Sequence, residues 1–307
     1  EMQLALEDAG KCREDAVRLV SDLNTVKTHF ILELIQNAED NSYQNCEIPE
    51  ISLIICNNRL VFQNNETGFT KENVEALCSI GRSTKKDKAM GYIGEKGIGF
   101  KSVFLISNRV DIYSNNYHFK FEYDKKDPLS MIKPILLEEI PDFIDVRITN
   151  IILYVNEEDK KYISDYSKIS SEFLLFLKKL KRINIINRIT GETSNIERYD
   201  NNGRILVKCN NIENYWKNIR KIVDVSHIEE YKRIGVKQRE LMMAFPLNSN
   251  GTADTENIRD IFAYLPVRNY GFRFIIHADF LLSASREDIH KKGEWNEYLR
   301  DNIIPVF

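Results

Sequence analysis

The most constraining feature of this sequence is a glycine-rich segment followed by an apolar run, from Gly91 to Phe104, which reads GYIGEKGIGFKSVF. Glycine tolerates positive backbone φ angles and lets the main chain approach a ligand closely. A glycine-rich loop that leads into a helix presents free N–H groups and the positive end of the helix dipole, which suits a phosphate group. The segment therefore predicts a phosphate-binding loop. Considered alone, however, it is more typical of a flexible loop followed by an ordinary helix.

Two common phosphate loops are excluded by spacing. A Walker A loop needs Lys and then Ser or Thr directly after its last glycine, but Phe100 separates Gly99 from Lys101 here. A Rossmann loop directly follows a strand, whereas residues 82–90 are polar and unlike a strand. A nucleotide bound by this chain would therefore need a different arrangement of loops.

The second strong segment is FILELIQNAEDN, residues 30–41. It predicts a helix with a buried apolar face, because its large apolar residues recur at helical spacing. Glu33 and Asn37 are four residues apart and so share another face of the same helix. A carboxylate flanked by apolar residues is costly unless it has a partner. On this helix alone, however, an ordinary surface Glu–Asn pair is the simpler interpretation.

The polar segments between these motifs carry further candidates. In NNETGFT, residues 64–70, Gly68 is suited to a tight turn and Thr70 to the N-cap of a helix over residues 71–80. The polar stretch 81–90 then supplies hydroxyl groups and cations just before the glycine loop. We interpret this stretch as a lid over phosphates that orders when nucleotide binds, with a solvated loop as the alternative.

The rest of the chain predicts a mixture of strands and helices, an α/β or α+β pattern. A domain boundary is expected near Asp165. Strands are expected at 51–56, 59–63, 110–114, 117–123, 147–155, 183–189, 204–209, 241–247 and 272–277, and helices at 4–23, 157–181, 212–222, 255–263 and 295–303.

Composition excludes several classes of protein. The 307 residues carry a net charge of −3, so no basic surplus indicates a nucleic-acid partner. No apolar run approaches the roughly 20 residues of a membrane span, and membrane binding is not expected. The five cysteines are odd in number and contain no C-x-x-C pair, which favours a reducing, intracellular compartment, the cytoplasm or nucleus.

Four motifs occur in an order that resembles the GHKL ATPases: ELIQNAED, NETGF, SIGRSTK and GYIGEKGIGFKSVF. The closest similarity is to the branch that includes sacsin and NO VEIN, which also has segments like AYLPV and FRFIIHADFLLSASREDI in the second half. The specific motifs lie within residues 30–104, and weaker similarity covers most of the rest. The resemblance implies a Bergerat fold, an α/β sandwich with helices on one face of a mixed sheet, over residues 1–165. A smaller α/β, transducer-like region is expected over residues 166–307, within a longer protein.

The resemblance also implies residue roles. Glu33 matches the general base that orients water onto the γ-phosphate, and Asn37 matches the Mg²⁺ ligand. Arg286 matches an S-R-E segment in the middle domain of the heat-shock chaperone. It is a candidate for a contact that senses the nucleotide state or holds the two domains, with a surface ion pair as the alternative. Contacts to the nucleotide are implied for Asp40, Asn64, Gly68, Ser83, Thr84, Lys85, Gly94, Lys96, Gly97, Gly99, Phe100 and Thr149.

One position departs from the family pattern D-x-G-x-G, whose Asp accepts the adenine amino group. Here Asn64 stands at the Asp and Glu66 at the first glycine. Asparagine offers both an acceptor and a donor, and its hydrogen bond lacks charge assistance. We therefore expect adenine still to bind, with modest affinity and poorer discrimination against GTP. The alternative is that Asn64 only caps the turn before Gly68.

The sequence thus predicts a slow, Mg²⁺-dependent ATPase that couples its ATP or ADP state to conformational change, with chaperone-like or assembly-switch behaviour. Expected partners are a second copy bound through the ATPase domain, and a protein client or downstream domains. A nucleotide-sensing or partner-binding module without turnover is the first alternative, and Glu33 argues against it. A histidine kinase on the same fold is the second, but the residues after His29 do not match a phosphoacceptor site. A DNA-directed role like that of MutL is disfavoured by the acidic balance.

Overall fold

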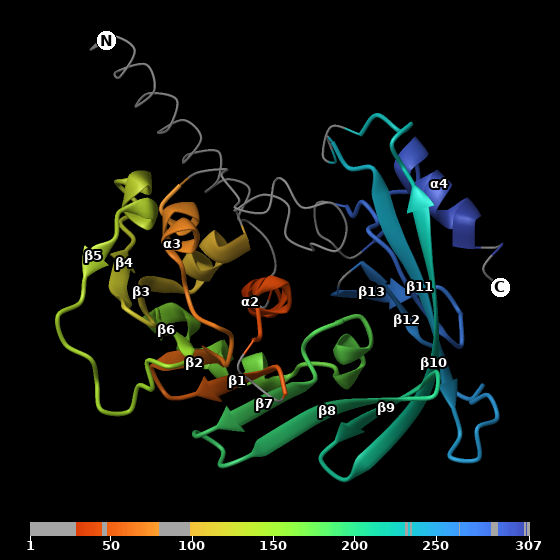
Figure 1. Cartoon of the computed structure of the whole chain (residues 1–307), viewed down its shortest axis with the longest axis horizontal. Coiled ribbons are helices and arrows are strands. Elements are labelled where there is room, and N and C mark those ends of the chain that lie inside the picture. The colour runs from red at the N-terminus through yellow and green to blue at the C-terminus, as the bar shows by residue number, and fades with distance from the viewer. Residues whose placement is uncertain are drawn as a thin grey trace. The chain divides into compact units, whose positions relative to one another are not determined.

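The structure is a computed structural model that describes residues 29–44, 48–79, 99–230, 233, 235–263, 265–283, 288–303 and 305. The chain divides into two compact units (Figure 1). The first unit comprises Glu1–Ile169 and Arg182–Ser194, and the second comprises Ser170–Lys181 and Asn195–Phe307. Each contains strands and helices, which agrees with an α+β class. The assignment of residues 1–165 and 166–307 to an ATPase domain and a transducer-like region stays a prediction, and the helix expected at 4–23 lies outside the described residues.

The sheet of the first unit has the strand order β7-β1-β2-β6-β3-β4-β5. Neighbouring strands are antiparallel except β1 and β7, which run parallel, so the sheet is mixed. The strands expected at 51–56 and 59–63, and at 110–114 and 117–123, form the antiparallel pairs β1–β2 and β3–β4. The strands are β1 (Glu50–Ile55), β2 (Arg59–Asn64), β3 (Ser107–Ser114), β4 (Tyr117–Glu122), β5 (Ile135–Leu136), β6 (Thr149–Val155) and β7 (Arg182–Asn187).

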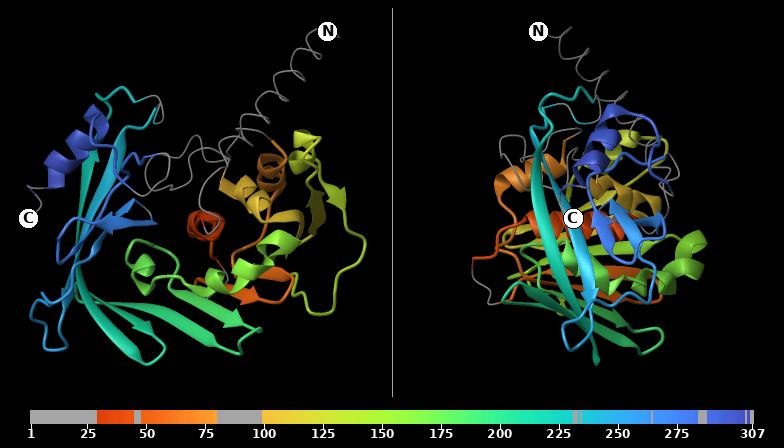
Figure 2. Two further views of the ribbon diagram at one scale, coloured as in Figure 1. Left: turned by 180° about the vertical axis from the view of Figure 1, so that it is seen from behind. Right: turned by 90° about the vertical axis from the view of Figure 1, so that its right-hand side faces the viewer.

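One face of this sheet is apolar because alternate residues of neighbouring strands point the same way. Leu53, Phe62 and Ile151 are paired across β1, β2 and β6 and are all buried. Helix α2 (His29–Asp40) lies across the sheet in Figures 1 and 2. Its predicted apolar face is confirmed, since the following residues are buried: Phe30, Ile31, Leu34, Ile35 and Ala38.

The opposite face of the sheet is covered by irregular chain between β5 and β6. Ile144 from this chain is buried in a cluster with Val61, Tyr113 and Ile152 from the strands, and Leu137 and Val146 pack against it. Both faces of the sheet are therefore shielded from water, which explains why side chains on both faces of β6 are buried.

Helix α3 (Lys71–Leu77) begins with the predicted cap at Thr70. The Thr70 Oγ1 atom accepts a hydrogen bond from the Asn73 N–H at 3.4 Å, and the Thr70 N–H donates to Asn73 Oδ1 at 2.9 Å. This reciprocal pair is a capping box with Asn in place of the usual Glu or Gln. It satisfies N–H groups that have no partner within the helix.

The sheet of the second unit has the order β13-β12-β14-β11-β10-β9-β8 and is antiparallel except between β12 and β14. Helix α4 (Glu294–Ile303) covers one face, where Trp295 and Leu299 are buried in a cluster with Leu241, Met243 and Ile276. The strands are β8 (Thr193–Asn201), β9 (Arg204–Cys209), β10 (Ile212–Asp224), β11 (Gln238–Leu247), β12 (Asp260–Ala263), β13 (Leu265–Asn269) and β14 (Ile275–His277).

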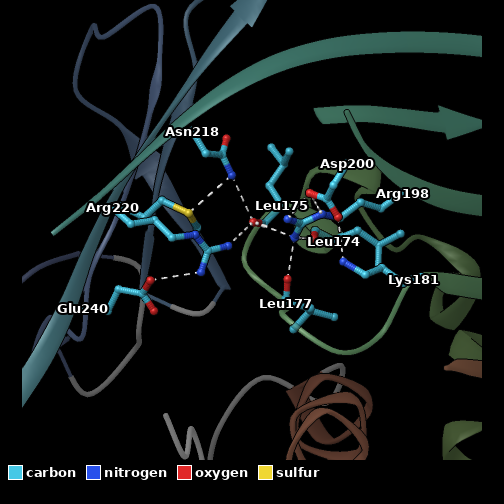
Figure 3. A network of polar contacts seen from close by, with 10 residues as sticks. Leu174, Leu175, Leu177, Lys181, Arg198, Asp200, Asn218, Arg220 and Glu240 are labelled. Carbon is cyan, nitrogen blue, oxygen red and sulfur yellow. Dashed lines mark hydrogen bonds and ion pairs between the residues drawn. The ribbon is translucent and has the colours of Figure 1, made fainter. Parts of the chain in front are cut away.

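A polar network in the second unit holds the chain that follows the short 3₁₀ helix η4 (Ser171–Leu175), as Figure 3 shows. The Leu175 carbonyl oxygen accepts hydrogen bonds from Arg198 at 3.3 Å, and from Asn218 and Arg220 at 3.2 Å each. Arg198 also donates to Asp200. Because η4 ends here, the Leu175 carbonyl oxygen has no helical partner. The side chains of Arg198, Asn218 and Arg220, which lie on strands, satisfy it.

Two predicted helices of the second unit are wrong. Residues 212–222 belong to the long strand β10, whose register with β11 runs from Tyr215 to Asp224. Its Ile, Tyr, Trp and Val residues favour strands, and pairing on both sides outweighs their helix-like spacing. Residues 255–263 contain the strand β12 in place of a helix, paired with β13 and β14. The strand expected at 272–277 begins only at Ile275.

Two further helix predictions need correction. The single helix expected over residues 157–181 is two 3₁₀ helices, η3 (Glu157–Ser167) and η4. Ser170 separates them because its side chain accepts from the Glu172 N–H and so starts a new helix. The apolar run after the glycine loop forms the 3₁₀ helix η1 (Gly99–Leu105), and no α-helix.

Thr70→Ala should lower the free energy of unfolding by about 1 kcal/mol, because it removes the acceptor of the capping box. Thr70→Ser keeps that acceptor and should remain within a few tenths of a kcal/mol of the parent. Urea denaturation of the three proteins measures the difference, and equal stability of the Ala and Ser variants would contradict the assigned cap.

Candidate functional site

Polar side chains replace the apolar ones at one end of the buried face of the first sheet. Asn64 on β2 is paired in register with Thr149 on β6. Ser114 at the end of β3 places its Oγ atom 2.6 Å from Oγ1 of Thr149. All three side chains are almost completely buried, at 2%, 2% and 0% exposure. The sheet thus ends in a row of buried polar groups, all of which need hydrogen-bond partners.

A chain of hydrogen bonds runs through this row to the carboxylate of Glu66, which is 7% exposed. The Phe69 N–H donates to Ser114 Oγ at 2.8 Å, and Thr149 Oγ1 donates to Glu66 Oε1 at 2.7 Å. A hydroxyl group has one proton. Since Thr149 gives its proton to Glu66, Ser114 must donate to Thr149. All three bonds therefore point toward Glu66, an arrangement in which hydrogen bonds strengthen one another.

Asn64 is engaged on its other side by Tyr43. The Tyr43 hydroxyl lies 2.9 Å from Asn64 Oδ1 and 2.7 Å from the Ala38 carbonyl oxygen near the end of α2. This contact connects the helix to β2. The side chain predicted to read the base is thus part of a structural contact between α2 and the sheet.

The turn that follows β2 depends on Gly68. Its φ angle is +88°, which disfavours any residue with a Cβ atom. A Cβ atom there would also overlap the side chain of Asn115, whose amide donates to the Thr67 carbonyl oxygen at 2.9 Å. The predicted tight turn is confirmed.

The structure brings Glu33 of α2 and Gly99 of η1 into direct contact, although they are 66 residues apart in the sequence. A Cβ atom built on Gly99 would overlap Oε2 of Glu33. A side chain at position 99 would therefore have to displace the end of the Glu33 side chain, and the constraint is one of space, since the Gly99 φ angle lies outside the positive range. The carboxylate of α2 lies directly beside the C-terminal end of the glycine-rich segment.

The remaining predicted site residues fall into two groups. Asn37 is partly exposed on α2, Asp40 is buried at its C-terminal end, and the Phe100 ring packs 6.3 Å from that of Phe121. Their predicted roles stay predictions. The second group lies outside the described residues: Ser83, Thr84, Lys85, Gly94, Lys96, Gly97 and Arg286.

Within the described residues, no group of three or more His, Cys, Asp or Glu side chains is arranged to hold a metal ion. This finding does not conflict with the Mg²⁺ expected at Asn37, because Mg²⁺ commonly takes one or two protein oxygens and completes its octahedron with phosphates and water. Among the helices that the structure describes, none is long and apolar enough to cross a membrane.

Lys101 is a buried residue that the sequence analysis did not identify as important. Its side chain is 1% exposed, and Nζ donates to the carbonyl oxygens of Leu77, at the end of α3, and of Met131, at 2.9 Å. Burial lowers the pKa of this amine from 10.5 to about 7, and nearby Cys78 partly opposes the shift. Lys101 thereby fixes η1, and with it Gly99, to α3 and to the 3₁₀ helix η2 (Pro128–Ile132).

Comparison with known proteins relates this chain to a plant protein. No protein-family model matches it. Over 94% of its length it is 33% identical to Protein NO VEIN of Arabidopsis thaliana. The chain and NO VEIN are related in sequence. The matched region is only 11% of NO VEIN, so this chain spans about a tenth of the length of that relative.

Weaker similarity extends to a chaperone and to a heat shock protein. About half of the chain, 48%, is 27% identical to 28% of Chaperone protein HtpG of Rhizobium etli. A similar share, 50%, is 26% identical to 23% of Heat shock protein 90-5, chloroplastic, of Arabidopsis thaliana. The similarities to these two proteins and to NO VEIN indicate that this chain is related to them in sequence. This agrees with the motifs found between residues 30 and 104.

Replacing Lys101 by Met should remove a pH dependence of stability. Between about pH 7 and 10.5 the unfolded chain binds a proton at Lys101 that the folded chain does not. The free energy of unfolding of the parent should therefore rise with pH in this window. Urea denaturation at pH 7, 8 and 9 should show this slope in the parent and in Lys71→Met, which alters an exposed lysine, and a smaller slope in Lys101→Met. Equal slopes in all three would contradict the buried amine.

The contact between Gly99 and Glu33 predicts a coupling that a double-mutant cycle can measure. Gly99→Ala should destabilise the parent by about 1 kcal/mol, because the added methyl group displaces the Glu33 carboxylate. In the Glu33→Ala background the same change should cost much less, since the overlapping atoms are gone. Additive effects in urea denaturation would contradict the contact.

Proposed function

We propose that the first unit is a nucleotide-binding domain of the GHKL type, which binds ATP with Mg²⁺ and hydrolyses it slowly. The observation that carries this proposal is the contact between Glu33 and Gly99. It joins the helix with the candidate base to the end of the candidate phosphate loop. The similarity to one protein named as a chaperone and one named as a heat shock protein supports the same class of function.

The described residues suit phosphoryl transfer, which needs positioning and charge more than covalent chemistry. In this proposal Glu33 orients the attacking water and accepts its proton. Asn37, one helical turn further along α2, provides an oxygen ligand for the metal. Bound Mg²⁺ supplies charge that neutralises the phosphate oxygens. Gly99 leaves room for the Glu33 carboxylate beside the loop.

We further propose that the nucleotide state of this domain controls a conformational change, in a chaperone-like or assembly-switch role. The support is the similarity to the chaperone HtpG and to Heat shock protein 90-5, each of which matches about half of this chain. The lid contacts of Ser83, Thr84 and Lys85, the phosphate contacts of Gly94, Lys96 and Gly97, and nucleotide sensing by Arg286 belong to this proposal. So do dimerisation through the ATPase domain and the binding of a protein client.

A nucleotide-sensing module without turnover is the second candidate. It is favoured by the hydrogen bonds that Asn64 and Thr149 make within the fold. They order the polar row at the end of the first sheet, and none of them is a hydrolytic contact. The two candidates differ at Glu33, since only a hydrolase uses this carboxylate as a base.

Glu33→Ala should retain ATP binding and lose turnover by ~10²–10⁴-fold, because a general base contributes a factor of this size. Calorimetry with ATP and Mg²⁺ measures the binding, and phosphate release measures the turnover. Glu75→Ala, which alters an exposed carboxylate of α3, is the matched control and should behave like the parent. Parental turnover in Glu33→Ala would eliminate the catalytic role, and a parent that binds ATP without turnover would favour the sensing module.

A further inference from the structure

The chain at and directly after β5 exposes several large apolar side chains to water. Ile135, Leu136, Ile140 and Phe143 are 43%, 75%, 43% and 54% exposed. No other stretch of this length in the described chain exposes more than two large apolar side chains. Single exposed apolar residues are normal on a protein surface, but a group of them indicates a binding surface. We call residues 135–143 the edge segment, which is the yellow-green chain at and after β5 in Figure 1.

The core of the first unit does not account for this exposure. Leu137 packs against the cluster under the sheet, and Ile144, directly after the edge segment, is buried in it. The chain thus already contributes side chains to the core, while its four exposed apolar residues face water. Phe143 is also held in place, because the Arg59 guanidinium carbon lies 4.9 Å from the centre of its ring. An ordered side chain loses little freedom when a partner binds.

The backbone of β5 offers a second kind of contact. β5 is the last strand of its sheet. One side pairs with β4, where Leu136 lies opposite Phe119 and Ile135 opposite Lys120. The other side pairs with no strand that the structure describes. Such an edge presents backbone N–H and C=O groups on which an extended peptide can form a further strand.

The edge segment carries three negative charges without compensation. Glu138, Glu139 and Asp142 are exposed, and none of them forms an ion pair within the described residues. The flanking cations Lys133 and Arg147 are each paired with another carboxylate, at 2.9 Å and 2.7 Å. The surface therefore combines apolar side chains with carboxylates that attract a cationic partner and repel an acidic one.

These charges also argue against a second copy of this chain as the occupant. A two-fold contact brings the same surface of both copies together, so the three carboxylates would face three more. Like charges that are opposed in this way disfavour association.

We infer that the edge segment binds an extended protein segment in which large apolar residues are interspersed with Lys or Arg. The apolar residues of the partner cover Leu136, Ile140 and Phe143, and its cations pair with the carboxylates between them. Its backbone extends the sheet at β5. This inference is independent of nucleotide binding.

The test measures the binding of labelled peptides to the whole chain by fluorescence anisotropy at low ionic strength. The probe is a peptide of repeated Lys-Leu, matched in length to the edge segment. Repeated Lys-Ser lacks its apolar side chains, and repeated Glu-Leu reverses its charge. Both control peptides should bind about tenfold or more weakly than Lys-Leu, because the apolar and the charged contacts both contribute.

Apolar variants locate the bound peptide. Leu136→Ser and Phe143→Ser should each weaken the binding of Lys-Leu by about tenfold, because each removes a large apolar side chain that the peptide would cover. Ile212→Ser is the matched control, since this isoleucine of β10 is 66% exposed. It should bind the peptide like the parent.

Charge variants test the second contribution. The triple change Glu138→Gln, Glu139→Gln and Asp142→Asn should weaken the binding of Lys-Leu and remove most of its dependence on salt concentration. Glu229→Gln, a change at an exposed carboxylate of the second unit, should alter neither.

The inference is overturned by a parent that does not bind Lys-Leu, by equal binding of the three peptides, or by edge-segment variants that bind like the parent. Sedimentation of the parent and of Leu136→Ser tests the other occupant. A parental dimer that becomes a monomer in this variant would also overturn the inference, because the edge segment would then be a contact between two copies.

Discussion

The pairing register between β2 and β6 is the constraint on which the first unit depends. Leu60 and Phe62 pair with Leu153 and Ile151, and the same face continues to the pair of Asn64 and Thr149. Because side chains alternate along a strand, a slip of one residue would turn this whole set to the other face. The register that buries the apolar core therefore also places the polar row. The core and the candidate site cannot vary independently.

Burying polar groups at the end of a sheet demands partners for all of them, and the turn after β2, together with Tyr43, supplies these. Leaving one such group unsatisfied costs about 1–3 kcal/mol. Contacts of Asn64 and of the turn reach β1, β3, β6 and the segment that follows α2: Asn64 with Tyr43, Asn65 with Glu50, Glu66 with Thr149, Thr67 with Ser42, and Phe69 with Ser114. The turn is thus ordered by the fold itself, so a ligand that binds there meets groups that are already in place.

Local patterns in the sequence predicted the elements whose stability is local. The helical spacing of Phe30, Leu34 and Ala38 gave the buried face of α2, and Thr70 gave the cap of α3. Residues 212–222 were misassigned because their apolar residues recur at helical spacing, while the long pairing of β10 with β11 decides the structure. Such pairing joins residues that are distant in the sequence, and no local pattern reports it.

The site could be predicted in its parts but not in its connections. The motifs identified Glu33 and Gly99 separately, and only the folded chain shows that the carboxylate occupies the space a side chain at Gly99 would need. Nothing in the sequence indicated that Lys101 is buried, because lysine side chains are usually exposed. The hydrogen bond of Thr149 to Glu66 likewise depends on the approach of the turn after β2 to the start of β6.

The same connection explains how the departure from D-x-G-x-G is accommodated. Within this turn, Gly68 has a positive φ angle and Glu66 does not. A side chain at position 66 is therefore free of backbone strain, whereas one at position 68 is not. Glutamate has one more methylene group than aspartate. From its place in the turn, the carboxylate of Glu66 accepts a hydrogen bond from Thr149 at the start of β6. Asn64, at the position of the pattern's Asp, joins β2 to α2 through its contact with Tyr43 and, from there, with the Ala38 carbonyl oxygen.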